Sequence, residues 1–257
     1  MSQSGVRVLT WNVQHASASR AGRQVSWLTR VDADAIVLTE VSAGAAGDVT
    51  ARQLRDAGYR VHLPDPGDDR YRVLLAARGV LDPVQVDIAV SPHRFPLARV
   101  KQASGFEFAL TGVYVPSRGS APFRNVAKRA FQHSVTTCLP GLAKTLPSLP
   151  VIVAGDLNVV EPGHIPHYSV FGAWEYDFYR SFAEAGFVDA FRLKHPDLID
   201  HSWLGRPSAD GTRNGYRFDH AFVSAAHRNM VHECRYQHRP RNNELSDHSA
   251  MILTLAS

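Results

Sequence analysis

The sequence predicts an α/β sandwich in which mixed β-sheets are covered by helices. Short apolar runs alternate with amphipathic stretches along the chain, without low-complexity segments or an evident short repeat. The apolar runs that predict strands outnumber the helical patterns, and some connections are too short for helical crossovers. Because parallel neighbours need such crossovers, mixed sheets with helices outside are favoured over a purely parallel sheet.

Apolar segments predict the main strands, and two segments bounded by prolines predict further ones. The main strands are expected at residues 6–11, 35–39, 71–76, 106–115, 151–154, 217–223 and 250–255, and the further ones at 84–90 and 97–101. Helical periodicity, with apolar residues three and four positions apart, predicts the helices. These are expected at residues 24–31, 45–57, 122–145 and 175–185.

The length of 257 residues and the composition, 44% apolar and 20% charged, are typical of a folded protein with a sizeable core. No composition shift marks a boundary, so we expect one catalytic domain over residues 1–257, and a monomer with no inferable protein partner. No apolar run approaches the roughly 20 residues of a membrane helix, and no secretion signal is expected at the start. The two cysteines, Cys138 and Cys234, exclude a disulfide framework and favour a cytoplasmic location.

Charge is unevenly distributed, although the formal net charge is only +4. Residues 101–150 carry six basic residues against Glu107 alone, whereas residues 151–200 carry three basic and eight acidic ones. This pattern is compatible with an acidic site flanked by a basic surface. A phosphate backbone would follow the basic residues Arg118, Arg124, Lys128 and Arg129, the alternative being a solvated helix without a partner.

Several predicted strands begin or end at polar side chains that bind metals or move protons. They are Asn12, Glu40, Asp156 with Asn158, Asp219 with His220, and Asp247 with His248. In a mixed sheet the C-terminal end of one strand lies beside the N-terminal end of an antiparallel neighbour, so all can share one edge. A carboxylate there is costly unless it is paired or bound to a cation, so the four carboxylates predict Mg²⁺, with Mn²⁺ as the alternative. Taken singly, each cluster is also typical of a turn or a helix start.

The order of these clusters resembles that of the endonuclease/exonuclease/phosphatase superfamily of metal-dependent phosphoesterases, from Val8 to Leu255. The matching segments are 10–12 (Thr-Trp-Asn), 38–41 (Leu-Thr-Glu-Val), 112–116 (Gly-Val-Tyr-Val-Pro), 155–158 (Gly-Asp-Leu-Asn), 217–219 (Arg-Phe-Asp) and 246–248 (Ser-Asp-His). Within the superfamily, segments 186–192, 195–196, 202–203 and 214–219 resemble exonuclease III and abasic-site endonucleases. The resemblance implies a four-layer sandwich of two mixed β-sheets flanked by helices, and a Mg²⁺-dependent nuclease acting on DNA.

Hydrolysis of a phosphodiester needs a cation on the phosphate, an oriented water and help for the leaving oxygen. Glu40 is expected to anchor the cation, with Asn12 as a neutral oxygen ligand or orienting group and Asp247 completing the site. The resemblance implies the same roles for Glu40 and Asn12. Gln14 stands where the family often has an aspartate, which weakens the case for a second tightly held metal.

The remaining polar groups are candidates for the chemical step. Asp156 is expected to deprotonate or orient the attacking water, and Asn158 to hold that water or the phosphate. His248 can donate to a non-bridging phosphate oxygen, with its tautomer fixed by Asp219. Tyr114 can donate to the phosphate or assist the leaving group. Sequence alone leaves the division of roles among the aspartates, Tyr114 and His248 open.

Four residues are candidates for substrate binding. Ser117 stands where relatives use an asparagine near the phosphate, so Arg118 is expected to take over part of that contact; its alternative is a solvated loop charge. Trp203, Tyr216 and Phe218 are expected to stack on DNA or to line a pocket for an extrahelical sugar, the alternative being ordinary packing beside the site.

Alternative functions remain open at this point. The segment 161–167 contains Glu161, His164 and His167, yet it has two prolines and no cysteine, so a surface loop is expected rather than a zinc site. A DNA nuclease is favoured by segment 186–219 and by the basic stretch 101–144. A phosphatase or phospholipid-type phosphodiesterase of the same superfamily is the second hypothesis, and a non-catalytic nucleic-acid-binding relative is the third.

Overall fold

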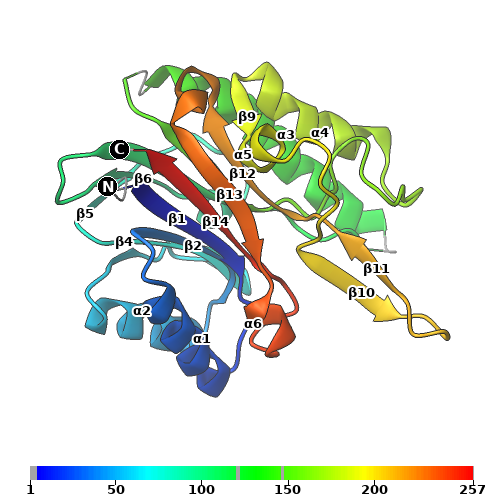
Figure 1. Cartoon of the computed structure of the whole chain (residues 1–257), viewed down its shortest axis with the longest axis horizontal. Helices are drawn as coiled ribbons and strands as arrows, with labels where there is room; N and C mark the ends of the chain where they lie inside the picture. The colour runs from blue at the N-terminus through cyan, green and yellow to red at the C-terminus, as the bar shows by residue number, and fades with distance from the viewer. Residues whose placement is uncertain (1–4, 120–121, 146–147, 257) are drawn as a thin grey trace.

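The computed structural model describes residues 5–119, 122–145 and 148–256, and it is built of four layers (Figure 1). Two six-stranded sheets pack face to face, and helices cover the outer face of each. The helices are α1 (Ala18–Val31), α2 (Ala45–Asp56), α3 (Pro122–Thr145), α4 (Ala173–Glu184), α5 (Ala190–Lys194) and α6 (Arg239–Asn242), with short 3₁₀ turns at Pro92–Arg94 and Ala225–Met230. None of the helices in these ranges is long and apolar enough to cross a membrane.

The first sheet has the strand order β13-β14-β1-β2-β4-β3. Only β1 and β2 are parallel, and the other neighbours are antiparallel. Its strands are β1 (Gly5–Asn12), β2 (Ala35–Ser42), β3 (Arg60–His62), β4 (Tyr71–Ala77), β13 (Val231–Gln237) and β14 (Ala250–Ala256). The polar C-terminal ends of β1 and β2 therefore lie at the same edge as the N-terminal end of β14.

The second sheet has the strand order β5-β6-β7-β8-β12-β9, in which only β7 and β8 are parallel. Its strands are β5 (Val80–Val84), β6 (Leu97–Lys101), β7 (Glu107–Tyr114), β8 (Val151–Asp156), β9 (Phe187–Asp189) and β12 (Asp219–Ser224). A separate antiparallel hairpin, β10 (Trp203–Pro207) and β11 (Arg213–Tyr216), projects from one end of the sandwich in Figure 1.

Three apolar layers hold the fold together, and strand β2 shows how the sequence divides between them. Val37 packs between the two sheets, whereas Ile36 and Leu38 pack towards α1 and α2. On β8, Ile152 similarly lies between the sheets while Val153 packs with the residues of α3 and α4. Because both faces of these strands are buried, their sequences are continuous apolar runs instead of alternating ones.

The predicted α/β sandwich of mixed sheets is confirmed, and the main strands and the helices over 45–57, 122–145 and 175–185 lie close to their predicted bounds. The helix expected at 24–31 begins earlier, at Ala18, because the Ser17 hydroxyl accepts the backbone N–H of Arg20 as an N-cap.

The prediction of a strand over residues 84–90 is wrong. Strand β5 lies upstream, where Pro83 is tolerated at the edge of the second sheet. The following segment packs on α3, and its backbone N–H groups at Ala89 and Val90 donate to the Ser134 hydroxyl instead of to a neighbouring strand.

Candidate active site

The polar strand ends meet at one edge of the sandwich. In the second sheet the register places Tyr114 beside Asp156 and Asp156 beside Asp219 on three neighbouring strands. The first sheet contributes Asn12, whose Nδ2 donates to Oδ2 of Asp156 at 2.9 Å. His248 comes from the segment just before β14. Both sheets therefore supply groups to one cluster, as the alternation of strand directions predicts.

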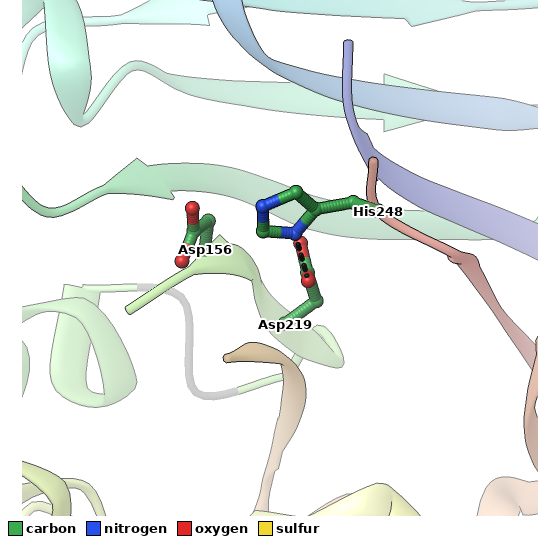
Figure 2. Close-up of side chains that lie close together, drawn as sticks. All are labelled: Asp156, Asp219 and His248. Carbon is green, nitrogen blue, oxygen red and sulfur yellow. Dashed lines mark hydrogen bonds and ion pairs between the residues drawn. The ribbon is translucent and has the colours of Figure 1, made fainter. Parts of the chain in front are cut away.

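Asp156, Asp219 and His248 form a compact, buried trio (Figure 2). Their ligand-capable atoms lie within 4.8 Å of one another. Nδ1 of His248 is 2.7 Å from Oδ2 of Asp219, a contact that fixes the orientation of the ring. The other ring nitrogen points towards Asp156 in Figure 2, so the imidazole has one nitrogen left for a substrate oxygen.

The charges in this trio shift the pKa values of Asp156 and His248. Burial by itself would lower the pKa of His248, but the neighbouring carboxylates, above all Asp219, raise it to about 10. Burial and the negative charge of Asp219 raise the pKa of Asp156 to about 7, against the opposing charge of His248. At neutral pH the imidazole is thus a positively charged donor, while Asp156 can gain or lose a proton, as a general base must.

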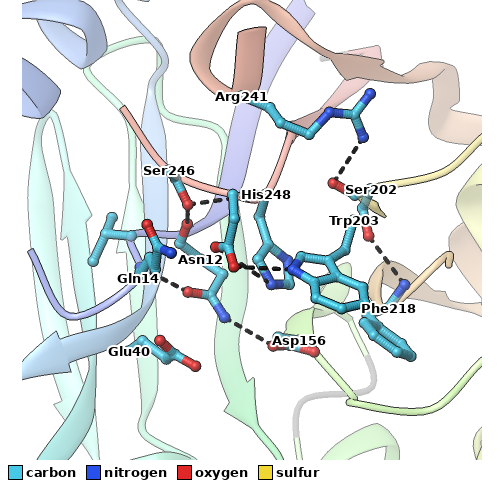
Figure 3. A network of polar contacts seen from close by, with 12 residues as sticks. Asn12, Gln14, Glu40, Asp156, Ser202, Trp203, Phe218, Arg241, Ser246 and His248 are labelled. Carbon is cyan, nitrogen blue, oxygen red and sulfur yellow. Dashed lines mark hydrogen bonds and ion pairs between the residues drawn. The ribbon is translucent and has the colours of Figure 1, made fainter. Parts of the chain in front are cut away.

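Two asparagines orient the Asp156 carboxylate: Asn12, whose contact is drawn in Figure 3, and Asn158. The backbone N–H of Asn158 donates to Oδ1 at 2.7 Å, and its side-chain Nδ2 donates to Oδ2 at 3.2 Å and to the Val115 carbonyl at 2.8 Å. Oδ1 of Asn12 accepts the backbone N–H of Gln14 at 2.8 Å. Asn12 is accordingly an orienting group whose amide oxygen keeps one lone pair for a cation.

Glu40 is held in a strained conformation beside Tyr114. Its φ angle is +54°, and the β2–β4 register shifts between Leu38 and Val41. The Tyr114 hydroxyl donates to Oε1 of Glu40 at 2.6 Å. Burial and the charges of Glu40 and Asp156 raise the pKa of Tyr114 well above 10, so this hydroxyl stays a donor.

Asp247 reaches the site from the turn before β14. Its Oδ2 accepts the indole N–H of Trp203 at 2.9 Å, and its Oδ1 lies 4.0 Å from Nε2 of His248. The Ser246 hydroxyl donates to the Asn12 carbonyl at 2.6 Å and accepts the backbone N–H of His248 at 3.1 Å. This serine therefore connects the end of β1 to the residues that enter β14.

A pocket of about 360 Å³ lies over these groups. Glu40, Asp156, Asn158, Asp247 and His248 line it, together with the predicted substrate-binding residues Arg118, Trp203, Tyr216 and Phe218. The aromatic side chains also pack on one another, with ring centroids 5.1 Å apart for Tyr216 and Phe218 and 5.8 Å apart for Trp203 and Phe218. The packing of the rings beside the site is confirmed, and all three side chains line the pocket, whereas their stacking on DNA stays a prediction.

The expected basic track is only partly present. The prediction that Lys128 follows a phosphate backbone is wrong, because its fully buried ammonium donates to Glu175 at 2.6 Å and to the Asn158 carbonyl at 2.7 Å. Arg118 lines the pocket and donates to the other oxygen of Glu175 at 2.9 Å. Arg129 is exposed, with its guanidinium 4.5 Å from the centre of the Trp174 ring. The side chain of Arg124 lies outside the described residues.

The segment 161–167 is not a simple surface loop. Glu161 is buried and binds the guanidinium groups of Arg192 and Arg217, which lower the pKa of its carboxyl to about 2 against the effect of burial. Nε2 of His164 accepts the backbone N–H of Arg217 at 3.2 Å. These contacts fix the segment just before Phe218 and Asp219, so its polar residues have a structural use.

Sequence reasoning missed several residues that shape the site. His15 contacts Glu40, Phe171 lines the pocket, and Glu175 holds Arg118. The Ser202 hydroxyl accepts the backbone N–H groups of Phe218 and Asp219 at 3.0 and 3.1 Å. No local pattern indicates these contacts, which join segments far apart in the sequence, although the acidic first turn of α4 could have drawn attention to Glu175.

The donor atoms fit a hard divalent cation. Among the described residues, Oδ1 of Asp219 and Oδ1 of Asp247 are buried and accept no hydrogen bond, as oxygens awaiting a cation or a substrate proton would be. Carboxylate and amide oxygens are the ligands that Mg²⁺ and Mn²⁺ prefer. The trio Asp156, Asp219 and His248 has ligand-capable atoms within 4.8 Å of one another, but Nδ1 of His248 already pairs with Oδ2 of Asp219, and Oδ2 of Asp156 accepts Nδ2 of Asn12. Glu40, Asn12 and Asp247 thus remain the better candidates for holding metal.

The chain is similar to known proteins over most of its length. The family model described as "Endonuclease/Exonuclease/phosphatase family" matches residues 9–248. An exodeoxyribonuclease from Bacillus subtilis (strain 168) is 27% identical over 245 residues, which cover 89% of this chain and 92% of the relative.

Solved structures share the fold. An AP endonuclease from Archaeoglobus fulgidus has a TM-score of 0.80 at 20% identity and covers 98% of this chain and 100% of its own. A 3′-5′ exonuclease from Neisseria meningitidis has a TM-score of 0.79 at 20% identity, with the same coverage. A 3′ phosphatase from Neisseria, solved with a product DNA hairpin, has a TM-score of 0.77 at 19% identity and covers 97% and 99% of the two chains.

Proposed function

Because the chain belongs to the endonuclease/exonuclease/phosphatase family, we propose that it is a metal-dependent DNA nuclease of the exonuclease III and abasic-site endonuclease type, with one catalytic domain over residues 1–257. The observation that carries the proposal is the buried trio of Asp156, Asp219 and His248 under a pocket that Glu40 and Asp247 also line. The names of the relatives support DNA as the substrate, since one is an exodeoxyribonuclease and another was solved with product DNA.

Three residues would hold the cation. Glu40 and Asp247 supply carboxylate oxygens and Asn12 an amide oxygen, a set that suits Mg²⁺ or Mn²⁺. When bound, the cation withdraws charge from the phosphate oxygens. Tyr114 keeps Glu40 in place through its hydroxyl, so its use as a donor to the phosphate would require that hydrogen bond to be given up.

The chain's own residues can carry the proton movements. Asp156, oriented by Asn12 and Asn158, takes a proton from the water that attacks phosphorus in line with the leaving oxygen. His248, protonated at neutral pH, donates to a non-bridging phosphate oxygen as negative charge accumulates there. Asp219 positions His248 by holding Nδ1.

The wall of the pocket supports a polymeric substrate. Trp203, Tyr216 and Phe218 offer aromatic faces on which a base or a sugar can pack. Arg118, fixed by Glu175, can pair with a phosphate next to the one that is cleaved. A second candidate, removal of 3′ phosphates from DNA, is supported by the phosphatase among the structural neighbours.

Charge reversal at Arg129 should weaken binding to duplex DNA, because it replaces an exposed positive charge, which can contact a phosphate, by a negative one. Arg129 lies on α3 next to the buried Lys128, and its guanidinium packs on the Trp174 ring of α4. In the unmodified protein the logarithm of the affinity should fall linearly with the logarithm of salt concentration, by about 0.9 for each phosphate neutralised. Arg129→Glu should reduce that slope by about one such contact. Fluorescence anisotropy with a labelled duplex at several salt concentrations measures both effects.

Arg52→Glu on α2 is the matched control, since Arg52 is also an exposed helical arginine but lies in the opposite helical layer. It should leave the salt slope unchanged, and neither variant should alter hydrolysis of a small generic diester. Equal losses of DNA affinity in both variants would mean that binding depends on the net charge of the protein and not on a contact at Arg129. DNA binding without salt dependence would remove the support for a phosphate-backbone contact.

A further inference from the structure

The turn after β1 has an unusual backbone that directs one side chain at Glu40. Gln14 and His15 have φ angles of +52° and +34°, and Glu40 itself has +54°. A non-glycine residue in this region is strained, so the conformation persists only where surrounding contacts impose it. Here the backbone N–H of His15 donates to the Glu40 carbonyl at 3.2 Å, and that of Val13 to the Thr39 carbonyl at 3.0 Å.

The two oxygens of Glu40 have different partners. Oε1 accepts the Tyr114 hydroxyl at 2.6 Å, whereas Oε2 lies 3.3 Å from Nδ1 of His15. The His15 side chain is 57% exposed and that of Glu40 only 19%. The His15 ring also lies 5.5 Å from the ring of Tyr71, which limits where the imidazole can turn. Glu40 thus has one oxygen fixed by a phenol and one facing an accessible imidazole.

Gln14, the other residue of the turn, directs its side-chain oxygen at Arg20 and not at Glu40. Its Oε1 accepts Nη1 of Arg20 at 3.0 Å, and its carbonyl accepts Nη2 of the same arginine. The side-chain oxygen is therefore taken up by a guanidinium of α1. Of the two residues in the turn, His15 is the one whose side-chain nitrogen lies beside Glu40.

We propose that His15 is a metal ligand, binding through Nδ1 to the same cation as Oε2 of Glu40. The proposal rests on the proposed function, which requires a cation at Glu40. Adjacent ligands on an octahedral ion, each about 2.1 Å from it, are about 3 Å apart, close to the 3.3 Å separation of these two atoms. An imidazole nitrogen favours later transition metals over Mg²⁺. The site should consequently bind Mn²⁺ and Co²⁺ more tightly than an all-oxygen site would.

The test is pulsed electron paramagnetic resonance of Mn²⁺ bound to the full chain, which detects nitrogen ligands through their ¹⁴N coupling. The wild-type protein should show this coupling, and His15→Ala should lose it. Calorimetry should find the Co²⁺ affinity of His15→Ala lowered about tenfold, and its Mg²⁺ affinity changed by less than about twofold. His133→Ala, at an exposed histidine of α3, is the matched control and should behave as wild type.

Two results would overturn the proposal: a wild-type Mn²⁺ signal without ¹⁴N coupling, or a coupling that persists in His15→Ala. The second result would assign the nitrogen to another residue such as His248 and leave His15 as a simple hydrogen-bonding partner of Glu40. If His15→Ala does not fold, His15→Gln removes the imidazole while keeping a polar side chain of similar reach. Failure of the proposed function is separate, because it would appear as metal binding at His15 and Glu40 without any hydrolysis of DNA.

Discussion

Replacing Asp156 with asparagine should lower kcat on a DNA substrate by about two to four orders of magnitude, the usual contribution of a positioned general base. The carboxylate is buried, its pKa is raised to about 7, and Asn12 and Asn158 both direct hydrogen bonds at it. An amide of the same shape can no longer take a proton from water. Single-turnover cleavage of a labelled duplex at saturating Mg²⁺ measures the chemical step directly.

The control for this substitution is Asp177→Asn on α4, where the aspartate is exposed and pairs with Arg180 three residues further on. This variant should keep full turnover. Circular dichroism and the melting temperature of Asp156→Asn should show that it still folds. A folded Asp156→Asn protein with near wild-type turnover would exclude Asp156 as the base.

Removing the imidazole of His248 should lower kcat by about 10²–10³-fold, the scale of one lost donor to developing charge. Its pKa, held at about 10 against the effect of burial mainly by Asp219, keeps it protonated at neutral pH. Asp219→Asn should cost less than His248→Ala, because it disorients the ring without deleting it. In both variants kcat should fall more than KM rises, since the lost interaction belongs to the transition state.

His232→Ala serves as the matched control, because His232 is an exposed histidine on β13. Near wild-type turnover in a folded His248→Ala protein would contradict the assignment of the site. A larger loss in Asp219→Asn than in His248→Ala would instead give Asp219 a direct role, which its unpaired, buried Oδ1 would then explain.

The sequence predicted the edge of the sandwich well, because that edge depends on strand ends. Apolar runs end directly at Asn12, Glu40 and Asp156. Strand direction brings Asn12 and Glu40 to one edge of the first sheet, and the packing of the two sheets brings Asp156 beside Asn12. The elements that were missed lack such runs. Strand β13 has no continuous apolar run, and β10 and β11 form a hairpin with few apolar residues. β10 and β11 pair with each other across a short loop, and β13 pairs with the next strand, β14, so it is the lack of an apolar run, and not a distant partner, that hides them.

A contact between distant segments explains why the basic stretch wrongly predicts Lys128 as a phosphate contact. Lys128 lies on the same face of α3 as the buried Phe131 and Val135, three and seven positions further on. Helical periodicity therefore indicates burial for Lys128, but its partner Glu175 is 47 residues away. The contact between His15 and Glu40 has no local signature either, since it depends on the positive φ angles of both residues.

The most direct test of the central claim is one substrate panel assayed with Mg²⁺ and again with excess EDTA. It contains abasic duplex, blunt duplex, single-stranded DNA, RNA, an inositol phosphate and sphingomyelin. If the protein is a metal-dependent DNA nuclease, it should cleave one or more of the DNA substrates with Mg²⁺. It should cleave none of them with EDTA until Mg²⁺ or Mn²⁺ is restored. Full activity in EDTA, or rapid hydrolysis of the inositol phosphate or sphingomyelin with no cleavage of any DNA, would contradict it.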